Sequence, residues 1–171
     1  MIEHWRKIEN IFKENDGSLP DIELNNLSGE EVIAGYEIIR NSSKCISSSN
    51  PYFWSKTKEA EISFTFLDNP ARGVISGEAE CFHVCFNGIK SPTGKTIPEL
   101  GLFVFTDSLS IDYRMGLQWN IDAIKGLFEL LLKLSNEFKD MKISHQGNLF
   151  DEEDVFVKAW INYSKPNTAD K

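Results

Sequence analysis

The stretch "LGLFVFTDSLSIDYR", residues 100–114, decides how the chain is read. Apolar residues stand on both sides of a short polar break at Asp107 and Ser108, and after the break Leu109, Ile111 and Tyr113 alternate with polar side chains. Alternation with a period of two is typical of a half-buried strand, so the stretch predicts a β-hairpin that turns at these two residues. In its second strand, Ser110, Asp112 and Arg114 point outward if Leu109, Ile111 and Tyr113 face the core.

Further strands are predicted on the N-terminal side of this hairpin. "EAEISFTFL" (59–67) alternates strictly, and residues 74–86 form a longer strand after the turn "DNPARG". Four consecutive strands joined by polar turns predict an antiparallel meander, to which "MKIS" (141–144) adds an edge strand. "PDIELNNL" (20–27) is a short strand or extended segment.

The flanking segments have helical periodicity. Residues 2–14 and about 29–40 place apolar side chains on one helical face, and Ser28 with Glu31 forms a capping box. A strongly amphipathic helix begins near Asn120 or Asp122, and residues 151–164 form another after an acidic start. The fold class is therefore α+β: a four- to five-stranded antiparallel meander, with two N-terminal and two C-terminal helices packed mainly on one face.

Length and composition suit one soluble domain. The chain has 171 residues, of which 41% are hydrophobic and 26% charged. We expect a single globular domain at 1–164 and a flexible tail at 165–171. Apolar runs fall short of the ~18 residues of a membrane span, and the charged N-terminus does not look like a secretory signal. The three cysteines are too few for a disulfide framework, which predicts a cytoplasmic protein.

The charge balance bears on the class of partner. Eighteen Lys and Arg against 26 Asp and Glu give a net charge of −8. Such a charge disfavours nucleic acid and anionic membranes, because both reward a basic patch. It permits a basic protein partner, and it is equally compatible with nothing more than solubility.

Two motif-like patterns lie in "CFHVCFNGIKSPTGKT", residues 81–96. The segment ends with Gly94-Lys95-Thr96, as a phosphate-binding loop does. However, Ile89 stands where that motif requires its first glycine, and a strand follows instead of a helix. We therefore interpret this segment as a connection between strands. Cys81, His83 and Cys85 share one strand face, yet the outer pair lies ~13 Å apart, too far for one metal ion. We expect no metal and no cofactor, with the cysteines in the core.

The surroundings of this strand leave three alternatives open. Glu78 and Glu80 share parity with Phe82, Val84 and Phe86, so the environment of that face must change along the strand. A bulge near Ala79 could shift the phase, or helices could cover only the second half of the strand. Alternatively, the three apolar residues belong to an exposed patch that binds a partner.

A search for catalytic patterns favours a non-enzymatic protein. No Gly-x-Ser-x-Gly elbow or paired acid–base motif is present, and the three histidines stand apart in sequence. The first hypothesis is a cytoplasmic interaction domain of immunity or regulatory type that binds a basic partner through an acidic surface. In composition alone, this character is similar to that of bacterial immunity proteins, which neutralise toxins. The candidate partner-binding residues are Glu59, Glu61, Glu78, Glu80, Asp112, the acids at 151–154, Trp54, Phe82 and Trp119.

The second hypothesis is a small-molecule-binding protein or enzyme. It expects a pocket between sheet and helices near His83, Tyr113 and Arg114. The two hypotheses differ in what the structure should contain, because the first requires an exposed acidic surface with aromatic residues and the second a closed concavity.

Overall fold

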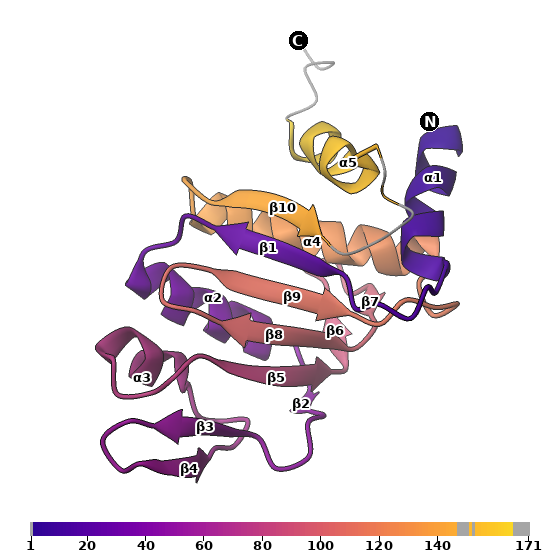
Figure 1. Ribbon diagram of the computed structural model, residues 1–171. Helices are drawn as coiled ribbons and strands as arrows, with labels where there is room; N and C mark the ends of the chain where they lie inside the picture. Colours follow the sequence, from indigo (N-terminus) through magenta and orange to yellow (C-terminus); the bar gives the residue numbers. More distant parts are fainter. Residues whose placement is uncertain (1, 147–150, 152, 166–171) are drawn as a thin grey trace.

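A computed structural model describes residues 2–146, 151 and 153–165 (Figure 1). The helices are α1 (Ile2–Lys13), α2 (Gly29–Asn41), α3 (Ala71–Ser76), α4 (Ile121–Glu137) and α5 (Val155–Ser164). The first strands are β1 (Asp21–Asn25), β2 (Cys45–Ile46), β3 (Tyr52–Ser55), β4 (Ala60–Ser63) and β5 (Phe82–Asn87). The remaining strands are β6 (Ile89–Lys90), β7 (Thr96–Ile97), β8 (Leu100–Val104), β9 (Leu109–Tyr113) and β10 (Lys142–Gln146).

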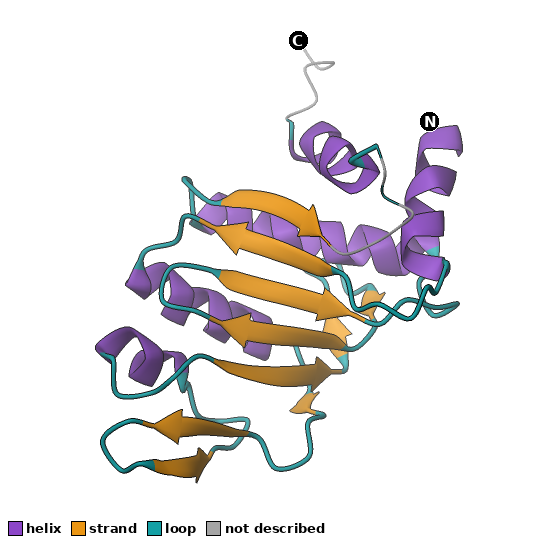
Figure 2. Ribbon diagram, in the orientation of Figure 1, coloured by secondary structure: helices purple, strands orange, loops and turns teal. Residues whose placement is uncertain are grey.

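A six-stranded antiparallel sheet in the order β10-β1-β9-β8-β5-β2 organises the chain (Figure 2). The predicted hairpin is confirmed as β8–β9 near its centre, where Leu102 pairs with Ile111. Its turn closes through a hydrogen bond from the Phe105 N–H to the Ser108 carbonyl, 3.1 Å. The predicted edge strand is confirmed as β10, whereas β1 lies inside the sheet between β10 and β9.

Helices cover one face of this sheet. α2 and α4 lie behind the strands in Figures 1 and 2, while none of the described helices lies on the face toward the viewer. The strand residues that point toward the helices form the core and are almost completely buried: Ile22, Leu24, Val84, Phe86, Leu100, Leu102, Leu109 and Ile111. The α+β class with one-sided helices is therefore confirmed, and the helix boundaries agree with the capping box at Ser28 and the Asn120 cap.

The strand predicted at 74–86 is wrong in its first half. Residues 71–76 form α3, Gly77 ends this helix in the left-handed conformation (φ 82°), and β5 begins only at Phe82. Ala71 and Val74 are three residues apart, so a helix buries both side chains on the same side. This burial favours a helix here over the strand that the weak alternation predicted. β4 also departs from the predicted meander, because it pairs with β3 in a separate hairpin beside β5.

The start of β5 at Phe82 bears on the three alternatives given above for this strand. Glu78 and Glu80 precede the strand, so no bulge is needed to explain their parity. Phe82 and Phe86 are buried against α2, with their ring centroids 6.0 and 5.8 Å from that of Tyr36. The exposed apolar patch is thus excluded. The expectation of cysteines in the core is wrong, because Cys81 is exposed and Cys85 only half-buried on the opposite face.

A series of buried hydrogen bonds connects the start of α5 to the sheet. His145 on β10 has a side chain only 1% exposed, and its Nδ1 lies 2.7 Å from Asp151 Oδ2. Its Nε2 lies 2.9 Å from the Tyr113 hydroxyl. Asp151 Oδ1 also accepts the backbone N–H of Val155 at the start of α5. The imidazole stacks on Phe156, with ring centroids 4.7 Å apart, so the hydrogen-bonded groups are packed among aromatic rings.

The buried His145 should make stability depend on pH. Burial lowers its pKa below the ordinary 6.5, an effect that the Asp151 carboxylate partly opposes. The unfolded chain therefore binds the proton more readily, and the free energy of unfolding should fall as pH drops from about 7.5 to about 5.5. Urea unfolding followed by circular dichroism measures this decline. H145Q should flatten it, and an unchanged slope in H145Q would assign the pH dependence to other groups.

Candidate functional site on the open sheet face

The face of the sheet without helices carries polar and aromatic side chains. We call it the open face. The strand residues that alternate with the core positions point toward it: Asp21, Glu23, His83, Cys85, Gly101, Phe103, Ser110, Asp112, Ser144 and Gln146. The strand register thus brings together acids from β1 and β9, an aromatic ring from β8 and a histidine from β5.

His83 and Asp112 form a hydrogen bond across the strand that separates them. His83 Nε2 lies 2.6 Å from Asp112 Oδ2, and the two side chains are 32% and 14% exposed. β8 lies between them and contributes Gly101, which pairs with Asp112 on β9. A methyl group at position 101 would overlap both the carboxylate and the imidazole. The missing side chain therefore creates the space that the hydrogen-bonded pair occupies.

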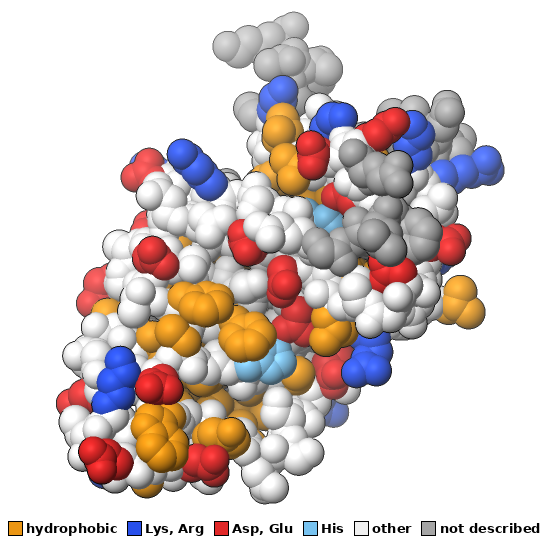
Figure 3. Space-filling model, in the orientation of Figure 1, with side chains coloured by type: hydrophobic (Ala, Val, Ile, Leu, Met, Phe, Trp, Pro, Cys, Tyr) orange, Lys and Arg blue, Asp and Glu red, His pale blue; other side chains and the backbone are white. Residues whose placement is uncertain are grey.

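An aromatic patch lies beside this pair. Phe103 contacts the His83 ring, with centroids 4.4 Å apart, and stacks on Phe105 at 5.9 Å. Tyr52 and Trp54 on β3 extend the patch, and each of the four side chains is between 37% and 49% exposed. They are the exposed large aromatic residues within the described ranges, and all lie on this side of the molecule. In Figure 3, hydrophobic side chains gather over the lower part of this face, interspersed with acids.

A cleft of about 450 Å³ separates the β3–β4 hairpin from β5. Its lining includes Trp54, Glu61, Glu80, His83 and Phe103. The segment from Ser48 to Tyr52 completes the wall. Trp54 pairs with Glu61 across the hairpin, and its carbonyl accepts the Glu80 N–H at 2.9 Å. Backbone pairing therefore sets two carboxylates beside one indole.

The structure brings several of the predicted partner-binding residues together at one place. Trp54, Glu61 and Glu80 meet at the cleft, and Asp112 joins them through His83. Glu59 lies in the β3–β4 turn, and Glu78 is exposed where its carbonyl accepts the Lys56 N–H.

Other predicted partner-binding residues do not belong to this surface. Trp119 is fully buried and Phe82 is 4% exposed, so their expected place on an exposed surface is wrong. Both side chains contribute to the aromatic core instead, Trp119 next to Phe12 and Phe82 next to Tyr36. Of the acids at 151–154, Asp151 is bound to His145, Glu153 and Asp154 are exposed, and Glu152 lies outside the described residues.

The prediction of a pocket between sheet and helices near His83, Tyr113 and Arg114 is wrong. His83 points to the open face, whereas Tyr113 points to the helices and is 1% exposed. Arg114 is exposed just beyond the end of β9. Since His83 and Tyr113 lie on opposite faces of the sheet, they cannot line one pocket.

Sequence reasoning missed Tyr52, Phe103, Phe105 and Gly101. A signal was present for the last three, because "GLFVF" places two phenylalanines and a glycine at the parity opposite to Leu102 and Val104. A glycine inside an otherwise regular strand often marks the close approach of another group. The contribution of Tyr52 depends on the β3–β4 hairpin, which local periodicity did not separate from the main sheet.

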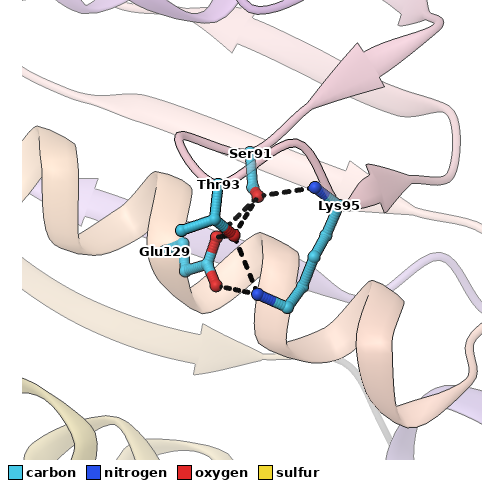
Figure 4. Close-up of polar contacts among 4 residues, drawn as sticks. All are labelled: Ser91, Thr93, Lys95 and Glu129. Atoms are coloured by element: carbon cyan, nitrogen blue, oxygen red, sulfur yellow. Dashed lines mark hydrogen bonds and ion pairs between the residues drawn. The ribbon is translucent and has the colours of Figure 1, made fainter.

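The loop that resembles a phosphate-binding motif joins two short strands, as interpreted. β6 and β7 form a hairpin in which Gly94 adopts a left-handed conformation (φ 88°). Lys95 contacts the Glu129 carboxylate on α4, and Ser91 and Thr93 each donate a hydrogen bond to it at 2.6 Å (Figure 4). The lysine that would bind a phosphate is therefore neutralised within the chain.

Glu129 thus fastens the hairpin to α4. Burial would raise the pKa of its carboxyl, but hydrogen bonds from Lys95, Ser91 and Thr93 outweigh this and lower the pKa to about 2. Contact with Glu129 correspondingly raises the pKa of the Lys95 ammonium. Within the described ranges, no three His, Cys, Asp or Glu side chains are arranged to hold a metal ion. No described helix combines the length and apolarity that spanning a bilayer requires.

Removing the Glu129 carboxylate should destabilise the protein. E129A leaves Ser91, Thr93 and Lys95 without their shared acceptor, and we expect a loss of about 1–3 kcal/mol in the free energy of unfolding. Denaturant titration measures the loss. E137A is the matched control, because Glu137 ends the same helix with an exposed side chain. Equal stability of the two variants would contradict a fastening role for Glu129.

A side chain at position 101 should displace the His83–Asp112 pair. We expect G101A to lower the free energy of unfolding by about 1–3 kcal/mol, since a methyl group must force apart two hydrogen-bonded groups. The cause can be tested by introducing G101A into an H83A/D112A background. There the methyl group has room, and the cost should largely disappear. A cost that persists would place the clash elsewhere.

Comparisons with known proteins identify no family. No protein-family model matches the sequence, and no curated protein matches it. Among solved structures, one described as the toxic C-terminal tip of CdiA from Pseudomonas aeruginosa in complex with immune protein aligns with a TM-score of 0.46 and 16% identity, over 70% of this chain and 79% of that chain. The Pseudomonas aeruginosa type VI secretion protein PA0821 aligns with a TM-score of 0.38 and 7% identity, over 77% and 43%. Likenesses this weak establish no shared function.

Proposed function

We propose that the protein is a non-enzymatic interaction domain that binds a protein partner through its open face. The observation that carries the proposal is the collection of Tyr52, Trp54, Phe103 and Phe105 on one face without a covering helix. Aromatic residues are enriched in the centres of protein interfaces, because they bury a large area with little loss of side-chain freedom. Four of them on one side exceed the scattered exposure of an ordinary surface.

The charges on this face favour a basic partner. Asp21, Glu23, Glu61, Glu80 and Asp112 surround or join the aromatic patch, within a chain of net charge −8. Positive side chains lie at the margins: Arg114 beyond β9, Lys142 at the start of β10, and Lys56 and Lys58 in the β3–β4 turn. Opposite potentials on two partners accelerate their encounter and fix their orientation.

An immunity or regulatory role is the form of this function that we favour. In it, the protein would cover a basic region of a toxin or enzyme and need no chemistry of its own. The thiols of Cys45, Cys81 and Cys85 are free, which supports action in a reducing compartment such as the cytoplasm.

A second candidate function is the binding of a small molecule in the cleft. Its volume of about 450 Å³ falls within the range of ligand pockets, and Asp112 orients the His83 ring on its wall. This version of the ligand-binding hypothesis places the ligand on the open face, rather than between sheet and helices.

Photo-cross-linking tests the proposed interface. We expect benzoyl-phenylalanine at position 103 to capture a defined protein in cells that make this chain, while the same group at Ile161 does not. Ile161 is the matched control, because it is 44% exposed on α5.

The captured protein should then bind the purified chain. W54S/F103S should weaken this binding by at least about tenfold, as expected for central aromatic residues, while the midpoint of unfolding changes little. Binding that survives the double substitution, or capture from both positions, would exclude the open face as the interface.

A further inference from the structure

We infer that the cleft between the β3–β4 hairpin and β5 is the seat of an arginine side chain supplied by the partner. The inference deepens the proposed function and rests on it. It assigns a chemical group to this cleft on the open face. The guanidinium would lie against Trp54 and be held by Glu61 and Glu80.

The aromatic side chains supply the first half of this recognition. Trp54 is 41% exposed, Tyr52 is 49% exposed, and both line the cleft together with Phe103. The face of an indole or phenol ring carries negative electrostatic potential, so it attracts a cation placed over it. A planar guanidinium can also stack on such a ring.

The carboxylates supply the second half. Glu61 is the cross-strand partner of Trp54, and Glu80 adjoins the same residue through its backbone N–H. Both side chains are exposed, and neither makes an ion pair with any residue that the structure describes. Among the described residues that line the cleft, none is Lys or Arg. Two carboxylates beside exposed rings, without a cation of their own, leave a charge that a ligand can balance.

Glu129 differs from the two carboxylates at the cleft. That carboxylate is also held near a loop, but Lys95, Ser91 and Thr93 already satisfy it. The basic side chains closest to the cleft in sequence, Lys56 and Lys58, belong to the β3–β4 turn and form no ion pair with Glu61 or Glu80. The protein thus neutralises one carboxylate internally and leaves the pair at the cleft available.

The geometry favours arginine over other ligands. An anion such as phosphate would face two carboxylates, with Asp112 behind His83. A lysine ammonium is compact and strongly hydrated, whereas a guanidinium is planar, weakly hydrated and able to stack while donating several hydrogen bonds. A cleft of about 450 Å³ also has room for the long side chain.

Short peptides test the assignment directly. We would titrate the 15N-labelled full-length protein with acetylated and amidated tetra-arginine, and in parallel with tetra-lysine. The arginine peptide should shift the Trp54 indole N–H signal, assigned by its loss in W54F, together with amides of residues 48–50, 52–54 and 80–83. It should bind at least about fivefold more tightly than the lysine peptide, which can form the cation–π contact but cannot stack.

Matched variants separate a specific seat from general attraction. E61Q/E80Q should weaken binding of tetra-arginine by at least about fivefold. E14Q/E137Q removes the same charge from exposed positions on other elements and should change the affinity by less than about twofold. Equal weakening in the two double variants, equal affinity for both peptides, or shifts confined to other surfaces would overturn the inference.

The captured partner distinguishes failure of this inference from failure of the proposed function. If W54S/F103S abolishes partner binding and E61Q/E80Q leaves it unchanged, the open face is the interface and the arginine seat is wrong. If tetra-arginine occupies the cleft but partner binding survives W54S/F103S, the seat exists and the proposed interface is wrong. If W54S/F103S and E61Q/E80Q both lose partner binding while E14Q/E137Q retains it, the result supports the proposed interface and the arginine seat together.

Discussion

One-sided burial of the sheet is the constraint on which the rest of the structure depends. α2 and α4 cover a single face, so alternate strand residues meet either an apolar core or an uncovered surface (Figure 1). The side that faces the helices is packed with aliphatic and aromatic residues. The other side combines acids with exposed aromatic rings, and the proposed function rests on these rings.

Two polar networks attach the peripheral elements to this frame. Glu129 gathers the β6–β7 hairpin onto α4, and the chain from Tyr113 through His145 to Asp151 holds α5 beside β10. Each network satisfies polar groups that would otherwise be costly to bury. Both lie away from the open face. The exposed carboxylates at the cleft therefore differ from the carboxylates of these two networks, which have partners within the chain.

Local patterns in the sequence predicted the elements better than their assembly. The hairpin around Asp107, the Ser28 capping box and the long helix after Asn120 follow from alternation and helical spacing, and all are present. The placement of β1 inside the sheet and of β3–β4 outside it depends on contacts distant in sequence. The same limit affected the site: Glu61, Glu80 and Trp54 were identified individually, but their convergence with Phe103 required the register of four strands.

The space left by Gly101 also constrains how the sequence can change over evolution. Because His83 and Asp112 meet above this glycine from strands that are not neighbours, the identities of the three positions are linked. A lineage that acquires a side chain at 101 has to shorten or reposition the groups at 83 and 112, and one that loses the His83–Asp112 hydrogen bond frees 101 to vary. In an alignment of relatives, these three columns would therefore change together, although they are separated by 18 and 11 positions in the chain. Such covariation would be a mark of this strand order that can be read without a structure.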